Sequence, residues 1–283
     1  MTHKTFPLQS KYSLKDSRMV TYILDGSVEI DPTPRPLVIL CPGGGYEYTS
    51  DREAEPVALA FNAQGFHAVV IRYSCAPATY PVAITEVALA MSIIKKNAKK
   101  WNVDTNKILI QGASAGGHLA LSYALFCKER EVLSDPVLTE ALTKNKQTAD
   151  DLTVNGVILS YPVVTSGTFA HRGSIENLLG KPYDTLSDHP LFKKMSLETQ
   201  IPKDFVPVFL WHTFTDDCVP AENSILLVTA LKKKNIPTEF HLFPAGGHGL
   251  GLANEITKIP GGYGVQKECQ IWIDLAADWI RRL

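Results

Sequence analysis

The fold is decided by one stretch of the sequence, Lys107-Ile108-Leu109-Ile110-Gln111-Gly112-Ala113-Ser114-Ala115-Gly116-Gly117-His118-Leu119-Ala120-Leu121. The apolar run at residues 108–110 is β-branched at two of its three positions, which favours a strand buried on both faces. The small residues at 112–116 then permit a sharp turn that holds the Ser114 hydroxyl clear of its neighbours. Good helix formers follow. The stretch therefore predicts a strand, a strained turn and a helix; the alternative is a glycine-rich turn whose serine has no chemical role.

Strand and helix patterns alternate on both sides of this stretch. Apolar runs with strand character lie at residues 19–24, 37–40, 68–71, 156–159, 207–211 and 238–243, and helical patterns lie at residues 51–62, 82–99, 223–234 and 266–282. This alternation predicts an α/β fold with a mostly parallel sheet covered by helices on both faces. Residues 31–36 contain too many prolines for a helix or a central strand, and residues 129–151 give no clear pattern.

The chain of 283 residues is long enough for two domains, but no linker-like segment divides it. We therefore expect a single domain over residues 1–283. Between residues 163 and 204 the pattern lapses into prolines, glycines and short helical pieces. A structureless loop of that length is unusual in a compact domain, which favours a lid-like insertion packed over one end of the sheet. The alternative is a solvated loop with no role.

Composition and charge argue against several kinds of partner. A net charge of −1 gives no reason to expect nucleic acid or an anionic membrane. Residues 1–15 contain no apolar stretch of signal-peptide length, and no run approaches the roughly 20 apolar residues that span a bilayer, so we expect a cytoplasmic location. The five cysteines are scattered and lack Cys-x-x-Cys spacing, which argues against a disulfide framework or a zinc site.

A serine hydroxyl is a poor nucleophile unless a base accepts its proton and an acid orients that base. The sequence offers both groups in loops just past two later strands, where active groups gather in this architecture. Asp216 follows one strand, and His248 follows the last strand between glycines that leave its backbone free to turn. We predict Ser114, Asp216 and His248 as catalytic residues, with Asp217 as a competitor for the acid. Three other histidines are expected to be structural: His118, His212 and His241.

Negative charge develops on a carbonyl oxygen when a hydroxyl attacks it, and each preorganised N–H group that meets this charge contributes roughly a hundredfold in rate. Ala115 supplies one N–H directly after the serine, and Gly44 and Gly45 in the triple glycine are placed to supply others. A phosphate-binding loop is the rival interpretation, but both the Gly-Lys-Ser/Thr of a P-loop and the third glycine of a dinucleotide fingerprint are missing. We expect neither a metal nor a cofactor.

Four motifs together resemble the α/β-hydrolase superfamily: Pro42-Gly43-Gly44-Gly45-Tyr46, Gly112-Ala113-Ser114-Ala115-Gly116-Gly117-His118, Trp211-His212-Thr213-x-x-Asp216 with Val219-Pro220, and Gly246-Gly247-His248-Gly249. They are most similar to bacterial acetyl esterases and acetylxylan-esterase-like enzymes, which are related to the hormone-sensitive-lipase type. The resemblance runs from about residue 37 to the C-terminus. It implies an α/β-hydrolase fold, and it supports Asp216 over Asp217. Pro42 stands where hormone-sensitive-lipase relatives carry histidine, which argues against a long-chain lipase.

The resemblance implies a serine esterase that acts on small-molecule esters with short acyl groups, acetyl above all, and acetylated sugars or xylo-oligosaccharides are the candidate substrates. A peptidase or amidase would use the same apparatus, and a binding protein without catalysis is a third hypothesis. Four aromatic residues either line the substrate pocket or are ordinary core residues: Tyr46, Phe169, Tyr183 and Phe192. The sequence leaves the alcohol, the preference for ester or amide and the oligomeric state open.

Overall fold

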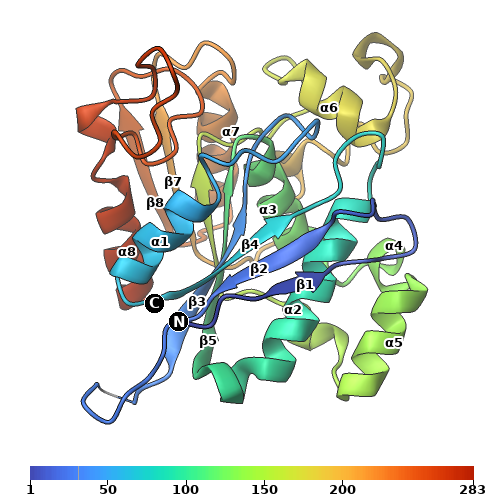
Figure 1. Cartoon of the computed structure of the whole chain (residues 1–283). Helices are drawn as coiled ribbons and strands as arrows, with labels where there is room; N and C mark the ends of the chain where they lie inside the picture. The colour runs from blue at the N-terminus through green and yellow to red at the C-terminus, as the bar shows by residue number, and fades with distance from the viewer. Residues whose placement is uncertain (31) are drawn as a thin grey trace.

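The strand and helix predicted around Ser114 are β5 (Val103–Ala113) and α3 (Ala115–Phe126) in the computed structural model, which describes residues 1–30 and 32–283. β5 lies inside a twisted sheet whose strand order is β1-β2-β4-β3-β5-β6-β7-β8 (Figure 1). Its apolar residues 108–110 are fully buried. Because both faces of the strand are covered, an uninterrupted apolar run is the pattern expected there.

The sheet is parallel except at one edge. β3 (Arg35–Cys41), β4 (His67–Arg72), β6 (Gly156–Ser160), β7 (Val208–Thr213) and β8 (Thr238–Phe243) run in the same direction as β5. At the edge, β1 (Thr5–Pro7) and β2 (Arg18–Tyr22) are antiparallel to their neighbours. The mostly parallel sheet expected from the sequence is confirmed. Parallel strands end at the same edge of a sheet, so the loops after β3, β5, β7 and β8 meet at its carboxyl edge.

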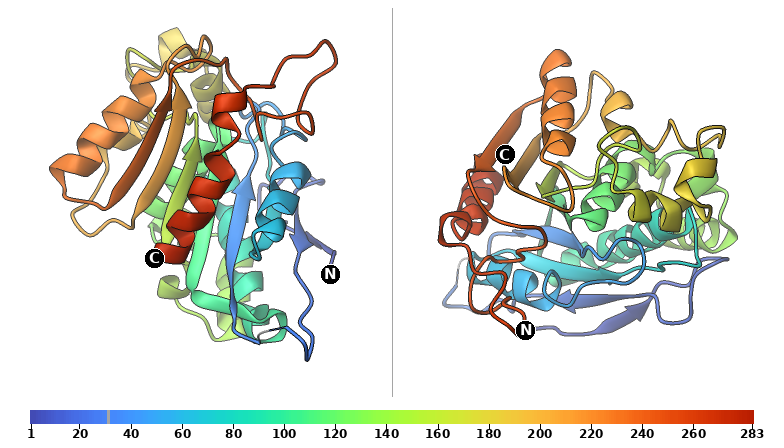
Figure 2. Two further views of the ribbon diagram at one scale, coloured as in Figure 1. Left: turned by 90° about the vertical axis from the view of Figure 1, so that its left-hand side faces the viewer. Right: turned by 90° about the horizontal axis from the view of Figure 1, so that it is seen from above.

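Helices cover both faces of the sheet (Figure 2). α1 (Glu55–Ala63) and α8 (Trp272–Arg282) pack on one face, whereas α2 (Val82–Trp101), α3 and α7 (Glu222–Lys233) pack on the other. Alternate residues of β3 serve the two cores, with Leu37 and Ile39 on the α2 side and Val38 and Leu40 on the α1 side. Across the described residues, we find no helix with both the length and the apolar character needed to cross a membrane.

Short elements occupy the segments that gave no clear sequence pattern. Residues 129–152 contain α4 (Arg130–Leu133), α5 (Pro136–Asn145) and the 3₁₀ turn η1 (Ala149–Leu152). The segment 163–204, hereafter the insertion, contains α6 (Arg172–Leu179) and the turns η2 (Tyr183–Thr185) and η3 (Leu197–Thr199). A last turn, η4 (Lys267–Cys269), precedes α8. The helix α6 lies at the carboxyl edge of the sheet, at the top of Figure 1.

The prediction that residues 31–36 form no part of the central sheet is wrong at its end. Asp31 lies outside the described residues, but Arg35 and Pro36 open the central strand β3. The pairing of β3 with β5 shifts register between Arg35 and Leu37. Pro36 therefore sits at an irregularity of the ladder, where its missing N–H group is tolerated.

Candidate active site

Ser114 sits between β5 and α3 with φ 54° and ψ −123°, a backbone conformation that residues with a side chain rarely adopt. Two glycines make this turn feasible. A β-carbon on Gly112 would lie 2.0 Å from the carbonyl oxygen of Gly116, and one on Gly116 would lie 2.0 Å from the carbonyl oxygen of Cys41. Although Ser114 occupies the N-cap position of α3, its side chain makes no capping hydrogen bond. Its hydroxyl is therefore available to another partner.

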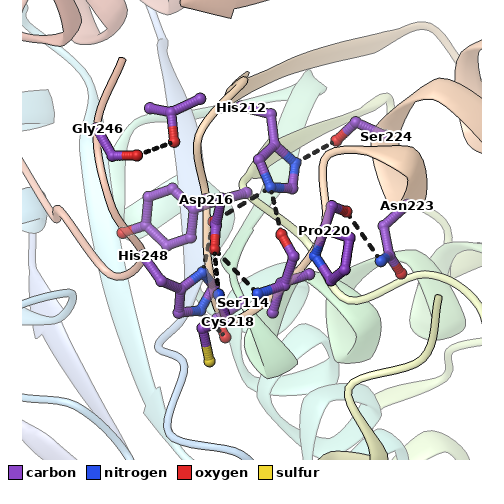
Figure 3. Close-up of polar contacts among 12 residues, drawn as sticks. Ser114, His212, Asp216, Cys218, Pro220, Asn223, Ser224, Gly246 and His248 are labelled. Atoms are coloured by element: carbon purple, nitrogen blue, oxygen red, sulfur yellow. Dashed lines mark hydrogen bonds and ion pairs between the residues drawn. The ribbon is translucent and has the colours of Figure 1, made fainter.

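The structure brings the three predicted catalytic side chains together at the carboxyl edge of the sheet (Figure 3). Nε2 of His248 lies 2.7 Å from Oγ of Ser114, and Nδ1 of His248 lies 2.7 Å from Oδ2 of Asp216. A carboxylate only accepts hydrogen bonds, so Nδ1 donates to Asp216 and Nε2 is left to accept the proton of Ser114. Asp217 is exposed and makes no contact of this kind, so the geometry favours Asp216 as the acid.

Asp216 is buried and held as an anion. Its Oδ1 accepts hydrogen bonds from the backbone N–H groups of Cys218 at 3.0 Å and Val219 at 2.9 Å. Burial would raise the pKa of Asp216, but hydrogen bonds from His212, His248 and the Val219 N–H group outweigh it and hold the pKa well below its ordinary value. The carboxylate therefore stays ionised throughout the pH range in which a histidine can act as a base.

His212 contacts Asp216 on the side away from His248 in Figure 3. This fully buried imidazole places Nε2 3.2 Å from Oδ2 of Asp216 and 3.0 Å from the carbonyl oxygen of Val219 (Figure 3). Both atoms only accept, so Nε2 carries a proton, and Nδ1 lies 2.7 Å from the Ser224 hydroxyl. The sequence places His212 among the structural histidines, and its contact with the acid shows that this structural position also serves the site.

The triple glycine presents two free N–H groups at the same edge. The Gly43 carbonyl accepts from the N–H of Ser50 at 2.9 Å, and the Gly44 carbonyl accepts from the N–H of Glu47 at 2.9 Å. In a trans peptide the N–H group points opposite to the carbonyl of the same unit. The N–H groups of Gly44 and Gly45 are therefore turned away from the loop, and neither has an acceptor within residues 1–30 and 32–283.

A third free N–H group comes from Ala115. As the first residue of α3, Ala115 has no intrahelical acceptor, and the described part of the chain supplies no other. It directly follows Ser114, at the positive end of the helix dipole. The three N–H groups predicted to form an oxyanion hole are thus all unpaired on the same rim as the serine, as such a role requires.

Glu53 and Tyr161 link the two loops that flank Ser114. One carboxylate oxygen of Glu53 accepts from the N–H of Gly43 at 2.7 Å, and the other accepts from the hydroxyl of Tyr161 at 2.7 Å. That hydroxyl in turn accepts from the N–H of Gly251 at 2.9 Å, and the Tyr161 ring packs edge-on against His248. No sequence pattern points to this pair, because the two residues lie 108 positions apart and neither belongs to a motif.

A cavity of about 270 Å³ opens beside Ser114. The residues around it are mostly polar or glycine: Gly44, Gly45, Glu47, Tyr48, Ser50, Arg52, Glu53, Ser114, His171, Cys218, His248 and Gly249. A cavity of this size suits a small group better than a long apolar chain. Cys218 is exposed here, unlike the other four cysteines, which are buried.

The four aromatic residues considered for a substrate pocket lie elsewhere than in this lining. Tyr46 is buried in the core, where its hydroxyl lies 3.0 Å from Nδ1 of His118. Tyr183 and Phe192 pack against each other within the insertion, with ring centroids 5.7 Å apart, and Phe169 is 37% exposed. Mostly polar residues and glycines, and not these four aromatics, line the cavity beside Ser114.

The insertion is tied to the loops beneath it. The side chain of Asn223 in α7 accepts from the N–H of Val164 at 2.9 Å and donates to the Phe169 carbonyl at 2.8 Å. From α6, the side chain of Asn177 donates to the carbonyl of Gly45 at 2.9 Å. The insertion therefore holds the loop that carries two of the free N–H groups. Its service as a lid stays a prediction.

Comparison with known proteins places these features in a family. The sequence profile of the BD-FAE family matches residues 29–231. Endo-1,4-β-xylanase B of Butyrivibrio fibrisolvens is 35% identical over 80% of this chain and 34% of its own length, and the acetylxylan esterase of Xylanibacter ruminicola is 27% identical over 78% of this chain and 42% of its own. The chain thus spans well under half of these two curated relatives.

A solved structure matches at nearly full length. The acetyl ester-xyloside bifunctional hydrolase of Caldicellulosiruptor lactoaceticus is 33% identical and superposes with a TM-score of 0.80, covering 99% of this chain and 96% of that one. At this identity the likeness extends beyond the fold to the sequence. Since the family profile also matches well over half of the residues, the chain belongs to the BD-FAE family and has the fold of the α/β-hydrolase superfamily.

Proposed function

We propose that this protein is a serine esterase that hydrolyses short-chain esters, above all acetyl esters of sugars or xylo-oligosaccharides. The observation that carries the proposal is the unbroken hydrogen-bonded chain from Asp216 through His248 to Ser114, with both contacts at 2.7 Å. Relatives named as an acetylxylan esterase and an acetyl ester-xyloside hydrolase support both the ester and the sugar. The cavity of about 270 Å³ lies below the usual range for small-molecule pockets, which supports a short acyl group.

In the first half of the reaction, Nε2 of His248 takes the hydroxyl proton of Ser114 as Oγ attacks the carbonyl carbon of the ester. Asp216 holds the imidazole in the correct tautomer and stabilises the imidazolium that forms. The carbonyl oxygen becomes negative and is met by three N–H groups, those of Gly44, Gly45 and Ala115. Collapse of the tetrahedral intermediate breaks the bond to the alcohol oxygen, which leaves with the proton from His248.

In the second half, a water molecule replaces the alcohol. His248 takes one proton from the water as its oxygen attacks the acyl-enzyme carbonyl, and the same N–H groups meet the negative oxygen again. The second intermediate then releases Ser114, which recovers its proton from His248. The products are one alcohol and one carboxylic acid, and the site returns to its starting protonation state.

The test is the hydrolysis of p-nitrophenyl acetate by Ser114→Ala. Without the nucleophile, turnover should fall at least about 10⁴-fold, while the circular dichroism spectrum stays that of the wild type. Ser122→Ala is the matched control, because Ser122 lies two turns further along α3 and, among the described residues, its hydroxyl hydrogen-bonds to His118 at 3.4 Å and to no catalytic group. A fluorophosphonate should label the wild type at Ser114 with one group per chain. Undiminished turnover by Ser114→Ala would refute the proposal.

The same assays separate the alternatives. An amidase or peptidase would cleave a matched acetanilide at least as well as the ester, and a binding protein would neither turn over ester nor react with the fluorophosphonate. Both outcomes contradict an esterase. We also place the reaction in the cytoplasm on small-molecule esters, and fractionation of cells followed by activity measurement tests that location.

A further inference from the structure

A second histidine shares the cavity with the proposed catalytic groups. His171 is the N-cap residue of α6 in the insertion, and it lines the cavity beside Ser114 and His248. It is half-buried, and no motif draws attention to it in the sequence. The catalytic steps above leave it without a role, although it faces the same space as the groups that perform them.

The partners of His171 fix which of its nitrogens carries a proton. Nδ1 faces two groups of Ser174, the backbone N–H at 3.3 Å and the hydroxyl oxygen at 2.8 Å. A backbone N–H only donates, so Nδ1 is the acceptor and the proton of the neutral ring resides on Nε2. Burial and then the proximity of His248 lower the pKa of His171, while Asp216 opposes them. A lowered histidine pKa keeps the ring neutral at neutral pH.

This Nε2–H group makes no hydrogen bond to the part of the chain that the structure describes. Among the described residues nothing accepts a hydrogen bond from it, and it is not among the buried polar atoms that lack contact with solvent. A site that leaves a donor free beside the nucleophile is suited to a ligand that carries an acceptor. The loop that bears His171 is anchored through the Phe169 carbonyl to Asn223, so the donor is held in place before a substrate arrives.

The position of His171 indicates which part of the substrate it meets. His171 lines the same cavity as His248 and interacts electrostatically with it, and His248 is the group that returns a proton to the departing alcohol. The helix that His171 caps also borders the loop of the oxyanion donors, because the Asn177 side chain donates to the Gly45 carbonyl at 2.9 Å. His171 therefore shares the cavity with the group that protonates the alcohol oxygen as it leaves.

We propose that Nε2–H of His171 donates a hydrogen bond to a hydroxyl oxygen of the alcohol portion, so that the enzyme prefers esters of polyhydroxylated alcohols such as a xylose unit over esters of plain alcohols. This inference rests on the proposed esterase function and adds the residue that selects the alcohol. A donor of this kind discriminates because an alcohol without the hydroxyl leaves the N–H unpaired in the closed complex.

Two substitutions separate the donor from the helix cap. His171→Asn keeps an acceptor near the position of Nδ1, and asparagine is a favoured N-cap, but its side chain is too short to replace Nε2–H. His171→Gln instead places an amide N–H near the position of Nε2. The matched control is His189→Ala, because His189 lies in the same insertion and also accepts a backbone N–H on Nδ1, yet does not line the cavity.

The measurement is kcat/KM for two acetyl esters of six-membered rings, a monoacetylated methyl xyloside and cyclohexyl acetate. His171→Asn should lower the value for the xyloside about tenfold and leave that for cyclohexyl acetate within twofold, His171→Gln should retain most of the preference, and His189→Ala should change neither. If the asparagine variant changes both esters equally, or neither, the inference is overturned while the esterase stands. A wild type that hydrolyses neither ester overturns the proposed function itself.

Discussion

His248 and His171 face the same cavity from two regions of the chain, and their inner nitrogens have opposite partners. Nδ1 of His248 donates to the carboxylate of Asp216, whereas Nδ1 of His171 accepts from the N–H of Ser174. In a neutral imidazole only one nitrogen carries a proton. Nε2 is therefore unprotonated in His248 and protonated in His171. One ring is set to take a proton and the other to offer one. The hydrogen-bond partner of Nδ1 thus decides whether Nε2 of a histidine in this cavity accepts or donates a proton.

The largest effect is expected from Asp216→Asn, which breaks this contrast. The amide nitrogen of asparagine can donate to Nδ1, which would force His248 into the tautomer that His171 adopts and block proton transfer from Ser114. We expect kcat for p-nitrophenyl acetate to fall about 10⁴-fold. Asp217→Asn, a change of the same charge one residue away, should stay within twofold. A drop of less than tenfold in Asp216→Asn would mean that the tautomer does not govern the base.

His118 sharpens the comparison because both of its nitrogens are occupied. Nε2 lies 3.1 Å from the Met195 carbonyl and Nδ1 lies 3.0 Å from the Tyr46 hydroxyl, and burial lowers the pKa of this ring from 6.5 to about 4. The unfolded chain therefore binds this proton first as the pH falls. The contribution of neutral His118 to the free energy of unfolding is complete above about pH 6.5. It falls towards pH 4, by roughly 3 kcal/mol at most.

Urea denaturation at a series of pH values measures this loss. The wild type should lose free energy of unfolding steeply between pH 6.5 and pH 4, and His118→Gln, which keeps a donor for Met195 but cannot be protonated, should lose less over the same interval. Parallel curves for the two proteins would show that another group is responsible for the acid sensitivity.

Another histidine, His212, acts on the proposed acid and not on the cavity. Its Nε2–H adds a hydrogen bond to Asp216 at 3.2 Å, and removing it in His212→Phe should let the pKa of Asp216 rise toward its ordinary value. We expect kcat to fall about tenfold with little change in KM, because His212 is fully buried and does not line the cavity. His212→Gln keeps an N–H donor and should recover part of the loss. If the two variants lose kcat equally, His212 acts by filling space.

The smallest effect is expected from Ser174→Ala. The substitution removes the hydroxyl beside Nδ1 of His171, but the backbone N–H of residue 174 remains and is shared between that Nδ1 at 3.3 Å and the His171 carbonyl at 3.1 Å. The ratio of kcat/KM for the acetylated xyloside and cyclohexyl acetate should therefore change by less than twofold. A larger change would show that the hydroxyl, and not the backbone, sets the tautomer.

The same two regions differ in how far the sequence predicts them. Short apolar runs and glycine motifs predicted the strand before Ser114, the free N–H groups of Gly44 and Gly45, and the approach of His248, because each is specified by neighbouring residues. His171 could not be predicted from the sequence, because its position depends on the path of an irregular insertion. Its partner Ser174, three positions away, belongs to no motif. The contact of Glu53 with Tyr161 could not be predicted either, because the two residues are distant in the chain.

The helix α6 has only eight residues, yet it bears on two tasks at once. At its start His171 faces the cavity, and six residues later the side chain of Asn177 donates to the backbone carbonyl of Gly45. Replacing this segment with that of a relative would thus change the preference for the alcohol and the rate of hydrolysis together. Engineers who wish to alter the alcohol without slowing the enzyme should vary the residue at position 171 and leave the asparagine alone.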